Sequence, residues 1–305
     1  MSDSVPDTRH SGQRAWVALP TYNERDNLEP LVVALFDAVP SVRVLVVDDN
    51  SPDGTGVLAD EIAARDPRVH VLHRPGKQGL GAAYRAAFGD LLSRADCDVI
   101  VQMDCDFSHD PADVARLLAA IESGADLVLG SRYVPGGGTP GWPVARRMIS
   151  RGGSLFARTV LRLPAHDLTG GFKAWRADVL RGIDLGRVGT QGYGFQIEMT
   201  WWASQRGATI QEISIVFSER RAGASKMSRR IVVEALLMVL RLRLAGARRA
   251  APSAGLGAPE AFGGLMGGAG GVTLDDLGPV AVVGMEHPAG RGLAAHRAGE
   301  AEPRS

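Results

Sequence analysis

The sequence predicts an α/β fold in which a mostly parallel central sheet is flanked by helices. Segments with strand character alternate with segments of helical periodicity from Ala15 to about Leu185. One strand segment, Val42–Val47, is continuously apolar, which is typical of a strand buried on both faces. Hydrophobic residues make up 45% of the 305 residues, which is ample for a core, and the length allows one large domain or two small ones.

The first half of the pattern runs strand, helix, strand, helix. Ala15–Leu19 is a short apolar run, and Asn27–Val39 has apolar residues at helical spacing. Val42–Val47 is the buried strand. We expect the next helix to open at Pro52, because Pro is favoured at the first helical position and Ser51 before it is a good N-cap.

The second half repeats this alternation with shorter strands. The expected strands are Val69–Leu72, Val99–Met103 and Leu127–Leu129. The helices between them are indicated by apolar residues that recur every three or four positions, at Ala82–Leu92 and Pro111–Ile121.

The composition divides the chain into three parts. We expect a disordered polar segment at residues 1–14, one folded domain at 15–248, and a disordered tail at 249–305, where a Gly, Ala and Pro-rich composition buries too little apolar surface to offset its ordering entropy. The formal net charge is zero, so no nucleic-acid partner is expected. Two cysteines, Cys97 and Cys105, fit a reducing compartment better than a disulfide framework.

Polar residues follow three of the expected strands. They are Pro20-Thr21-Tyr22-Asn23-Glu24, Asp48-Asp49-Asn50-Ser51 and Asp104-Cys105-Asp106. Ligands of open α/β sheets bind beyond the carboxyl ends of the strands, so these carboxylates should meet at one rim. Their mutual repulsion is relieved if a cation and a hydrogen-bonding ligand bind there.

Asp104 and Asp106 are the candidate metal ligands. Carboxylates two residues apart can hold one hard cation, and Mg²⁺ or Mn²⁺ accepts carboxylate and phosphate oxygens together. Such an ion would neutralise the charge of a diphosphate that leaves during a reaction. His109 is a further ligand candidate. The alternative is that the two aspartates cap the following turn; their position after a buried strand, beside other acidic residues, favours the metal.

Further motifs continue in order along the chain. They are Gly130-Ser131-Arg132-Tyr133, Asp167-Leu168-Thr169-Gly170-Gly171-Phe172-Lys173, Phe195-Gln196-Ile197-Glu198-Met199 and Glu219-Arg220-Arg221-Ala222-Gly223-Ala224-Ser225-Lys226-Met227. Together with the strand-end motifs, this set resembles the inverting family-2 glycosyltransferases of GT-A (Rossmann-like) fold. It is similar in particular to the dolichyl- or polyprenol-phosphate mannosyltransferases, from about Ala15 to Leu244.

The resemblance implies a reaction. The donor would be GDP-mannose, the cofactor Mg²⁺ or Mn²⁺, and the acceptor a polyprenyl phosphate of the dolichyl type. Attack from the face opposite the nucleotide would invert the anomeric centre and give polyprenyl-phosphate β-mannose and GDP. No general base is needed, because a phosphate monoester with a second pKa near ~6 is already anionic at neutral pH.

The resemblance also assigns residues. Those expected to contact the donor nucleotide are Pro20, Tyr22, Glu24, Val47 and Asp49. The metal and donor block comprises Asp104, Cys105 and Asp106, with both aspartates as ligands and Cys105 acting through its backbone. Basic residues that would hold phosphates are Arg132, Arg220 and Lys226. The expected catalytic residues are Asp106, Arg132 and Asp167.

Two basic, partly apolar segments are candidates for membrane contact, Met148–Leu163 and Ile231–Leu244. In the first, Leu155, Phe156, Thr159, Val160 and Leu163 are expected to lie near one another. Ordinary core helices with a charged outer face are the alternative. The lipid acceptor favours a peripheral protein at the cytoplasmic face of the membrane, held by these helices or by a membrane-anchoring protein partner.

Two other functions remain open from the sequence. One is a related lipid-phosphate glycosyltransferase that uses UDP-glucose or another donor. The other is a non-catalytic protein that binds nucleotide sugars, against which the intact acidic and basic motifs argue.

Overall fold

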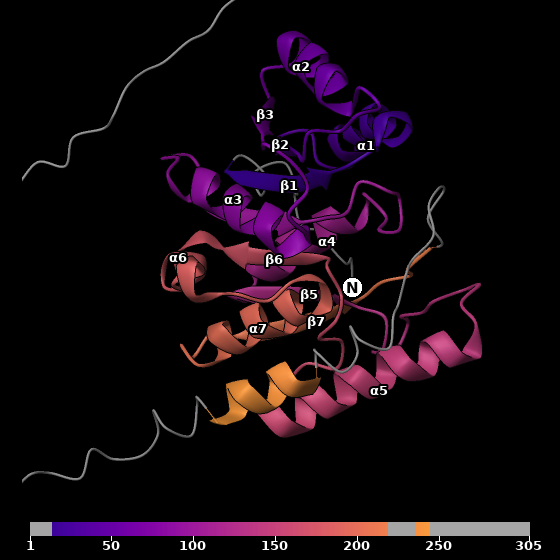
Figure 1. Ribbon diagram of the computed structural model, residues 1–305, viewed down its shortest axis with the longest axis vertical. Helices are drawn as coiled ribbons and strands as arrows, with labels where there is room; N and C mark the ends of the chain where they lie inside the picture. The colour runs from indigo at the N-terminus through magenta and orange to yellow at the C-terminus, as the bar shows by residue number, and fades with distance from the viewer. Residues whose placement is uncertain (1–13, 219–235, 245–305) are drawn as a thin grey trace, which may run out of the picture. The chain divides into compact units, whose positions relative to one another are not determined.

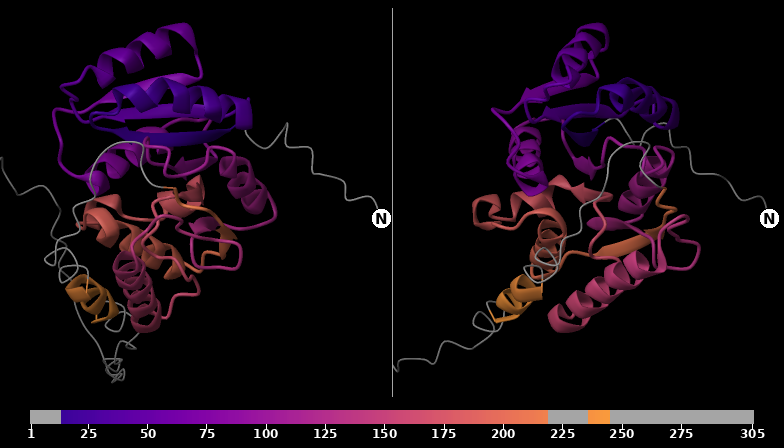
Figure 2. Two further views of the ribbon diagram at one scale, coloured as in Figure 1. Left: turned by 90° about the vertical axis from the view of Figure 1, so that its right-hand side faces the viewer. Right: turned by 45° about the vertical axis from the view of Figure 1, so that its right-hand side comes forward.

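The computed structural model describes residues 14–218 and 236–244. The segments expected to be disordered lie almost wholly outside these residues, and so do Arg220 and Lys226. The described residues contain a central sheet with helices on both of its faces (Figures 1 and 2).

The sheet has seven strands in the order β3-β2-β1-β4-β6-β5-β7. Their bounds are β1 Ala15–Thr21, β2 Arg43–Asp48, β3 Val69–His73, β4 Val99–Gln102, β5 Leu127–Ser131, β6 Lys173–Arg176 and β7 Ile210–Ser214. Every pairing is parallel except those of β6, which runs antiparallel to both β4 and β5. The predicted mostly parallel α/β sheet is confirmed, and the antiparallel insertion of β6 is an addition to it.

Helices cover the sheet on both sides. Their bounds are α1 Arg25–Ala38, α2 Thr55–Arg65, α3 Leu80–Leu92, α4 Asp113–Glu122, α5 Val144–Leu161, α6 Ala177–Arg181 and α7 Gly192–Ser204, with a 3₁₀ turn at Leu185–Arg187 and a further helix at 236–244. One apolar cluster joins the sheet to α1, α2 and α4, and a second joins it to α3, α6 and α7. Strand β1 contributes Trp16 and Ala18 to the second cluster and Val17 and Leu19 to the first, which explains why its sequence is continuously apolar.

The predicted start of the second helix is wrong by three residues. Helix α2 begins at Thr55, and Gly54 before it has φ 88°, a conformation that suits glycine. The carboxylate of Asp53 accepts hydrogen bonds from the Thr55 backbone N–H and hydroxyl, at 3.0 and 2.6 Å. Ser51 instead donates its hydroxyl to Asp48 and accepts the N–H of Asn23. Side-chain bonds therefore tie the loops after β1 and β2 together.

The strand register brings the polar motifs to one edge. Thr21 at the end of β1 pairs with Asp48 at the end of β2, and Ala18 pairs with Gln102 at the end of β4. The chain therefore leaves all three strands at the same side of the sheet, as the sequence predicts.

Candidate functional site

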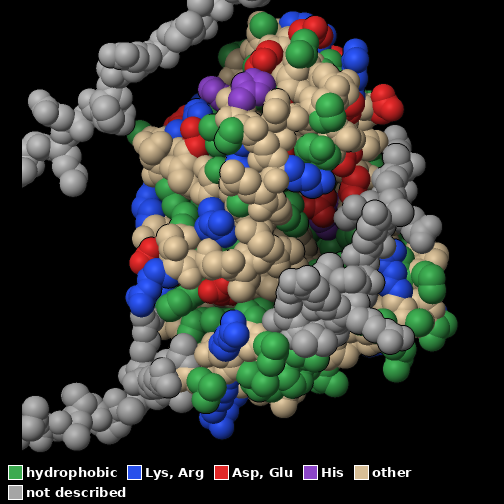
Figure 3. Space-filling view, in the orientation of Figure 1, with side chains coloured by type: hydrophobic (Ala, Val, Ile, Leu, Met, Phe, Trp, Pro, Cys, Tyr) green, Lys and Arg blue, Asp and Glu red, His purple; other side chains and the backbone are tan. Residues whose placement is uncertain are grey.

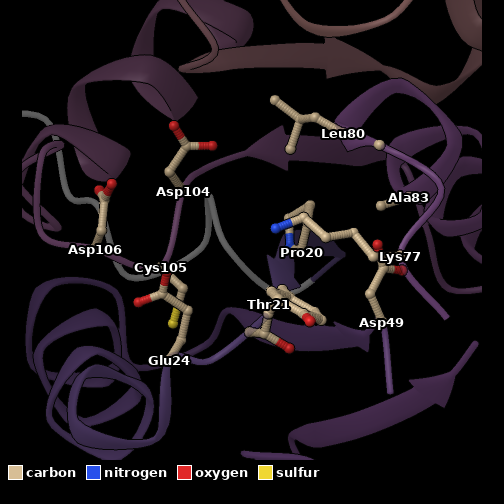
Figure 4. Close-up of a pocket in the computed structure, with 12 residues that line it drawn as sticks. Pro20, Thr21, Glu24, Asp49, Lys77, Leu80, Ala83, Asp104, Cys105 and Asp106 are labelled. Atoms are coloured by element: carbon tan, nitrogen blue, oxygen red, sulfur yellow. The ribbon is translucent and has the colours of Figure 1, made fainter. Parts of the chain in front are cut away.

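A cavity of about 250 Å³ lies at this edge (Figure 4). It is lined by residues that follow β1, β2 and β4 and by the loop that opens α3: Pro20, Thr21, Tyr22, Glu24, Asp49, Lys77, Gly79, Leu80, Ala83, Asp104, Cys105 and Asp106. Apart from Val47 and the further ligand candidate His109, the residues expected to contact the nucleotide and the metal all meet at one cavity. We call it the rim cavity.

Asp104 and Asp106 lie along one wall of the rim cavity, and Asp49 and Lys77 lie along the opposite wall (Figure 4). The chain turns between the two aspartates and the next helix because Phe107 adopts φ 58°. Asp106 is buried, and it accepts the backbone N–H of Ser108 at 3.0 Å. The capping role that competed with metal binding in the sequence is thus present, and it leaves Asp106 on the cavity wall.

The two aspartates influence a buried tyrosine behind them. Burial raises the pKa of Tyr84 well above its ordinary value, and the negative charges of Asp104 and Asp106 raise it further. The phenol is therefore neutral at any physiological pH. Both aspartates thus lie close enough to the phenol for their charges to add to the effect of burial.

The donor atoms at this wall fit a divalent cation. Carboxylate oxygens are the hard ligands that Mg²⁺ and Mn²⁺ prefer. Within the described part of the chain, no cluster of three or more His, Cys, Asp or Glu side chains is arranged to hold a metal by itself. Two carboxylates supply only part of an octahedral ligand shell, which suits an ion that also binds the phosphates of a ligand.

Asp49 is engaged by an arginine that the sequence did not single out. The guanidinium of Arg74 donates to Asp49 and, at 3.1 Å, to Gln78, while the Arg74 N–H donates to the Asp48 carbonyl. Burial raises the pKa of Asp49, and the charge and hydrogen bond of Arg74 offset only part of that increase. Arg74 therefore fixes Asp49 and joins the loop before α3 to the end of β2.

Lys77 is a second residue that sequence reasoning missed. Its ammonium lies 3.9 Å from the centre of the Tyr22 ring, within cation–π distance. In the sequence, Lys77 precedes the loop Gly79-Leu80-Gly81, which matches no phosphate-binding motif. In the fold it places a positive charge in a cavity whose other charged lining residues are acidic.

Val47 and Cys105 enter the site less directly. Val47 is fully buried in the core and does not line the rim cavity. The thiol of Cys105 is also buried, next to Glu24 (Figure 4), and burial followed by the charge of Glu24 raises its pKa well above the ordinary value. The Cys105 side chain is therefore a packing group.

A second cavity of about 140 Å³ adjoins the rim cavity and shares Leu80 and Asp104 with it. We call it the arginine cavity. Its lining is basic and aromatic: Leu80, Asp104, His109, Arg132, Trp142, Arg146, Thr169, Gly170, Gly171, Gly192, Tyr193, Gln196 and Phe217. Asp104 therefore stands at the junction of an acidic cavity and a basic one.

Arg132 is held in place by Asp167. Its Nε and Nη2 donate to the two carboxylate oxygens at 2.6 and 2.7 Å, and Nη2 also donates to the Thr169 hydroxyl at 2.9 Å. Burial alone would raise the pKa of Asp167, but the charge and hydrogen bonds of Arg132 outweigh it and the pKa is lowered. Asp167 is fully buried and lines neither cavity, and its carboxylate holds Arg132 and accepts a hydrogen bond from Thr169.

Two further residues of the arginine cavity were not predicted in their observed roles. Arg146, on α5, lies 3.8 Å from the centre of the Trp142 ring. The Nδ1 atom of His109 accepts the Asp104 N–H at 3.4 Å, and the imidazole stacks on Phe172. His109 therefore braces the Asp104 backbone through this nitrogen.

Helix α5 has a different outer face from the one expected. Phe156 and Val160 pack against the core, and Leu163 is buried in it. The exposed apolar residues are Val144, Met148, Ile149 and Leu155. The helix at 236–244 likewise buries Met238, Val239 and Leu242 and exposes Leu237, Leu240 and Leu244. Hydrophobic side chains with scattered basic ones gather over these helices at the bottom of Figure 3.

The family described as "Glycosyl transferase family 2" matches residues 16–183. The chain belongs to glycosyl transferase family 2. This glycosyltransferase is 49% identical to the polyprenol monophosphomannose synthase of Mycolicibacterium smegmatis, over 77% of its own chain and 88% of that protein. It is 52% identical to the undecaprenyl-phosphate mannosyltransferase of Micrococcus luteus, over 76% of its own chain and 95% of that protein.

The fold also has solved counterparts. One is glucosyl-3-phosphoglycerate synthase from Mycobacterium tuberculosis in complex with Mn²⁺, UDP-glucose and glycerol 3-phosphate. The TM-score is 0.57 at 19% identity, and the match covers 80% of this glycosyltransferase and 86% of that chain. The similarity confirms the predicted GT-A fold.

Proposed function

We propose that this glycosyltransferase moves mannose from GDP-mannose to a polyprenyl phosphate of the dolichyl type, giving polyprenyl-phosphate β-mannose and GDP. The observation that carries the proposal is the pair of adjoining cavities that share Asp104, one acidic and one lined by Arg132 and Arg146. The relatives at about half identity, named for polyprenol- and undecaprenyl-phosphate mannose transfer, supply the sugar and the class of acceptor.

The rim cavity takes the donor in this proposal. Tyr22 packs on the nucleoside, and Asp49 and Glu24 accept hydrogen bonds from base or ribose donors. Asp104 and Asp106 hold a Mg²⁺ or Mn²⁺ ion, which would neutralise the diphosphate when bound. Lys77 adds a point charge on the opposite wall.

The arginine cavity takes the acceptor phosphate. Arginine suits this task because its planar guanidinium recognises phosphate oxygens with two parallel hydrogen bonds. Asp167 holds Arg132, and Trp142 lies under Arg146, so both cations are oriented before the ligand arrives. Arg220 and Lys226, outside the described residues, are proposed to add phosphate contacts.

The chemistry is a direct displacement. An anionic oxygen of the acceptor phosphate forms a bond to the anomeric carbon as the bond from that carbon to the GDP oxygen breaks. No proton has to be removed from the acceptor, because a phosphate monoester is ionised near neutral pH. The protein contributes alignment and charge stabilisation, which together account for a large rate enhancement.

The outer surface of α5 and of the helix at 236–244 is proposed to rest on the membrane. Exposed Met148, Leu155 and Leu240 stand among arginines of the same helices, a pattern that favours binding at an anionic lipid surface. Arg146 links this surface to the arginine cavity, because it lies on α5 and lines that cavity. A lipid-borne phosphate would therefore enter from the membrane side.

None of the described helices has the length and apolarity needed to cross a bilayer. We propose a peripheral association with the cytoplasmic face, by these helices or with a membrane-anchored protein partner. The buried, unpaired thiols of Cys97 and Cys105 are in keeping with a reducing compartment.

The test is transfer of label into lipid. Purified protein is incubated with Mg²⁺, undecaprenyl phosphate and labelled GDP-mannose or UDP-glucose. We expect label in the lipid from GDP-mannose, with release of GDP. Label from UDP-glucose alone would replace the proposed donor, and label from neither donor would favour a non-catalytic nucleotide-sugar binding protein.

A further inference from the structure

The side chain of Gln196 is buried and has no hydrogen-bond partner. Only 2% of the residue is exposed, and neither Nε2 nor Oε1 is bonded to any residue that the structure describes. An amide in that position destabilises the fold unless a partner from outside the chain compensates it. Gln196 lines the arginine cavity, so a partner can reach it there.

The backbone of Gln196 is fixed by two hydrogen bonds. Its carbonyl accepts from the ammonium of Lys173 at 2.8 Å and from the Thr200 hydroxyl at 2.9 Å. Lys173 is itself fully buried on β6. These contacts tie the first turns of α7 to the sheet and hold the Gln196 side chain at the cavity.

Because Gly171 has no side chain, there is space between the amide of Gln196 and the carboxylate of Asp104 at the rim cavity. A methyl group built at Gly171 would lie 3.5 Å from Gln196 Nε2 and 3.8 Å from both carboxylate oxygens of Asp104. The space beside Gly171 is thus bordered by an unpartnered amide on one side and by the proposed metal ligand on the other. A group that binds there contacts both.

We propose that Gln196 recognises the hydroxyl groups of the donor sugar and so contributes to the choice of hexose. The inference rests on the proposed function, in which the sugar lies between the diphosphate near Asp104 and the acceptor phosphate near Arg132. A sugar hydroxyl both donates and accepts, and an amide offers Oε1 and Nε2 as the matching partners. A site that hydrogen-bonds a substrate hydroxyl rejects analogues that lack it, because its own polar groups are then left unpaired.

The first test distinguishes a contact with the sugar from a contact with the nucleotide. Gln196→Met preserves the length of the side chain and removes the amide, and Gln205→Met, at an exposed position just after α7, is the matched control. We expect Gln196→Met to weaken binding of GDP-mannose about tenfold or more while binding of GDP stays unchanged. Equal losses for both ligands, or no loss for either, would overturn the assignment.

A second variant guards against an effect of Gln196→Met on folding. Gly171 has no positive φ and the nearest atoms to an added methyl are at ordinary contact distances, so Gly171→Ala fits the empty protein. The methyl would occupy the gap, so this variant should keep the wild-type melting temperature and GDP affinity and lose GDP-mannose affinity. Wild-type affinity for GDP-mannose would contradict the proposed position of the sugar.

Donor analogues that each lack one hydroxyl identify the hydroxyl that Gln196 binds. GDP-mannose analogues that lack the hydroxyl at C2, C3, C4 or C6 are compared in the wild type and in Gln196→Met. The loss in kcat/KM caused by Gln196→Met should disappear for one of these donors, and an identical loss with all of them would overturn the proposal. If the wild type uses UDP-glucose instead, the donor assignment fails separately, and UDP-glucose against UDP then tests Gln196.

Discussion

Arg132 and Asp167 form a buried ion pair in which two guanidinium nitrogens donate to the two carboxylate oxygens, and the Arg132 backbone N–H donates to the same carboxylate at 3.0 Å. Removal of the carboxylate would leave the guanidinium buried without its counter-charge. We therefore expect Asp167→Ala to lower the free energy of unfolding by about 3–5 kcal/mol. Urea unfolding measures this loss.

The control for Asp167 is an exposed ion pair. Asp178 pairs with Arg181 one turn away on the surface, and Asp178→Ala should leave stability close to that of the wild type. Asp167→Asn keeps an oxygen acceptor, so it should retain more stability than Asp167→Ala while the KM for the acceptor rises. An Asp167→Ala variant as stable as Asp178→Ala would contradict the positioning role.

Asp106 is expected to act through its charge. Asp106→Asn can still accept the Ser108 N–H, so the fold should persist, but transfer should fall by roughly 100-fold or more, the scale seen when an electrostatic stabiliser is removed. Asp110→Asn is matched to it, because Asp110 is exposed and also accepts a backbone N–H, from Ala112. Steady-state assays should show a loss in Asp106→Asn only; full activity there would refute its role at the metal.

Lys173 should make stability depend on pH. Burial lowers the pKa of its ammonium to about 7 in the folded protein, against 10.5 for an exposed lysine. Between these values the unfolded chain binds more protons than the folded one, so stability rises with pH. Below pH 7 the folded protein carries the full cost of the buried charge.

This prediction is tested by comparison with Lys173→Met. From pH 7 to 9 the unfolding free energy of the wild type should rise by about 2 kcal/mol more than that of the variant. Chemical denaturation at several pH values measures both curves, and contributions of other groups cancel in the difference. Parallel curves would show that the ammonium keeps an ordinary pKa in the fold.

Arg146 and Arg147 are neighbours on α5 with different expected effects. Arg146 lines the arginine cavity, whereas Arg147 is exposed and does not. Arg146→Ala should raise the KM for a detergent-dispersed polyprenyl phosphate roughly tenfold or more, through loss of a charge-assisted hydrogen bond. Arg147→Ala should change it little. Equal effects of the two variants would mean that the arginines act only as general surface charge.

The apolar face of α5 can be tested apart from catalysis. Met148→Ser and Leu155→Ser together remove exposed apolar surface, and we expect weaker co-sedimentation with phosphatidylglycerol vesicles. Val57→Ser, at an exposed position on α2, is the matched control. Turnover of a detergent-dispersed acceptor should be unchanged. Undiminished vesicle binding would place the membrane contact elsewhere.

Much of the rim cavity is predictable from sequence, because its residues come directly after the ends of strands. A parallel sheet delivers the residues after β1, β2 and β4 to one edge whatever the rest of the fold does, so Tyr22, Asp49 and Asp106 are expected together. The five acidic residues of these motifs do not all line the rim cavity, however. Asp48 turns away to bind Ser51 and Thr21.

The arginine cavity was not predictable in the same way. It gathers Trp142, Tyr193 and Phe217 from segments far apart in the chain, and its position depends on the antiparallel strand β6 between β4 and β5. Four residues, Lys173–Arg176, are too few for periodicity to distinguish a strand from a loop. The unpartnered amide of Gln196 has no sequence signal at all, since hydrogen-bond satisfaction is known only once the neighbours are placed.

The cation site is tested most directly by diffraction from crystals soaked with Mn²⁺ and GDP. The account predicts an anomalous peak in the rim cavity that contacts the carboxylates of Asp104 and Asp106 and the diphosphate. An ion bound elsewhere, or no ion in crystals of a preparation that transfers mannose, would contradict it.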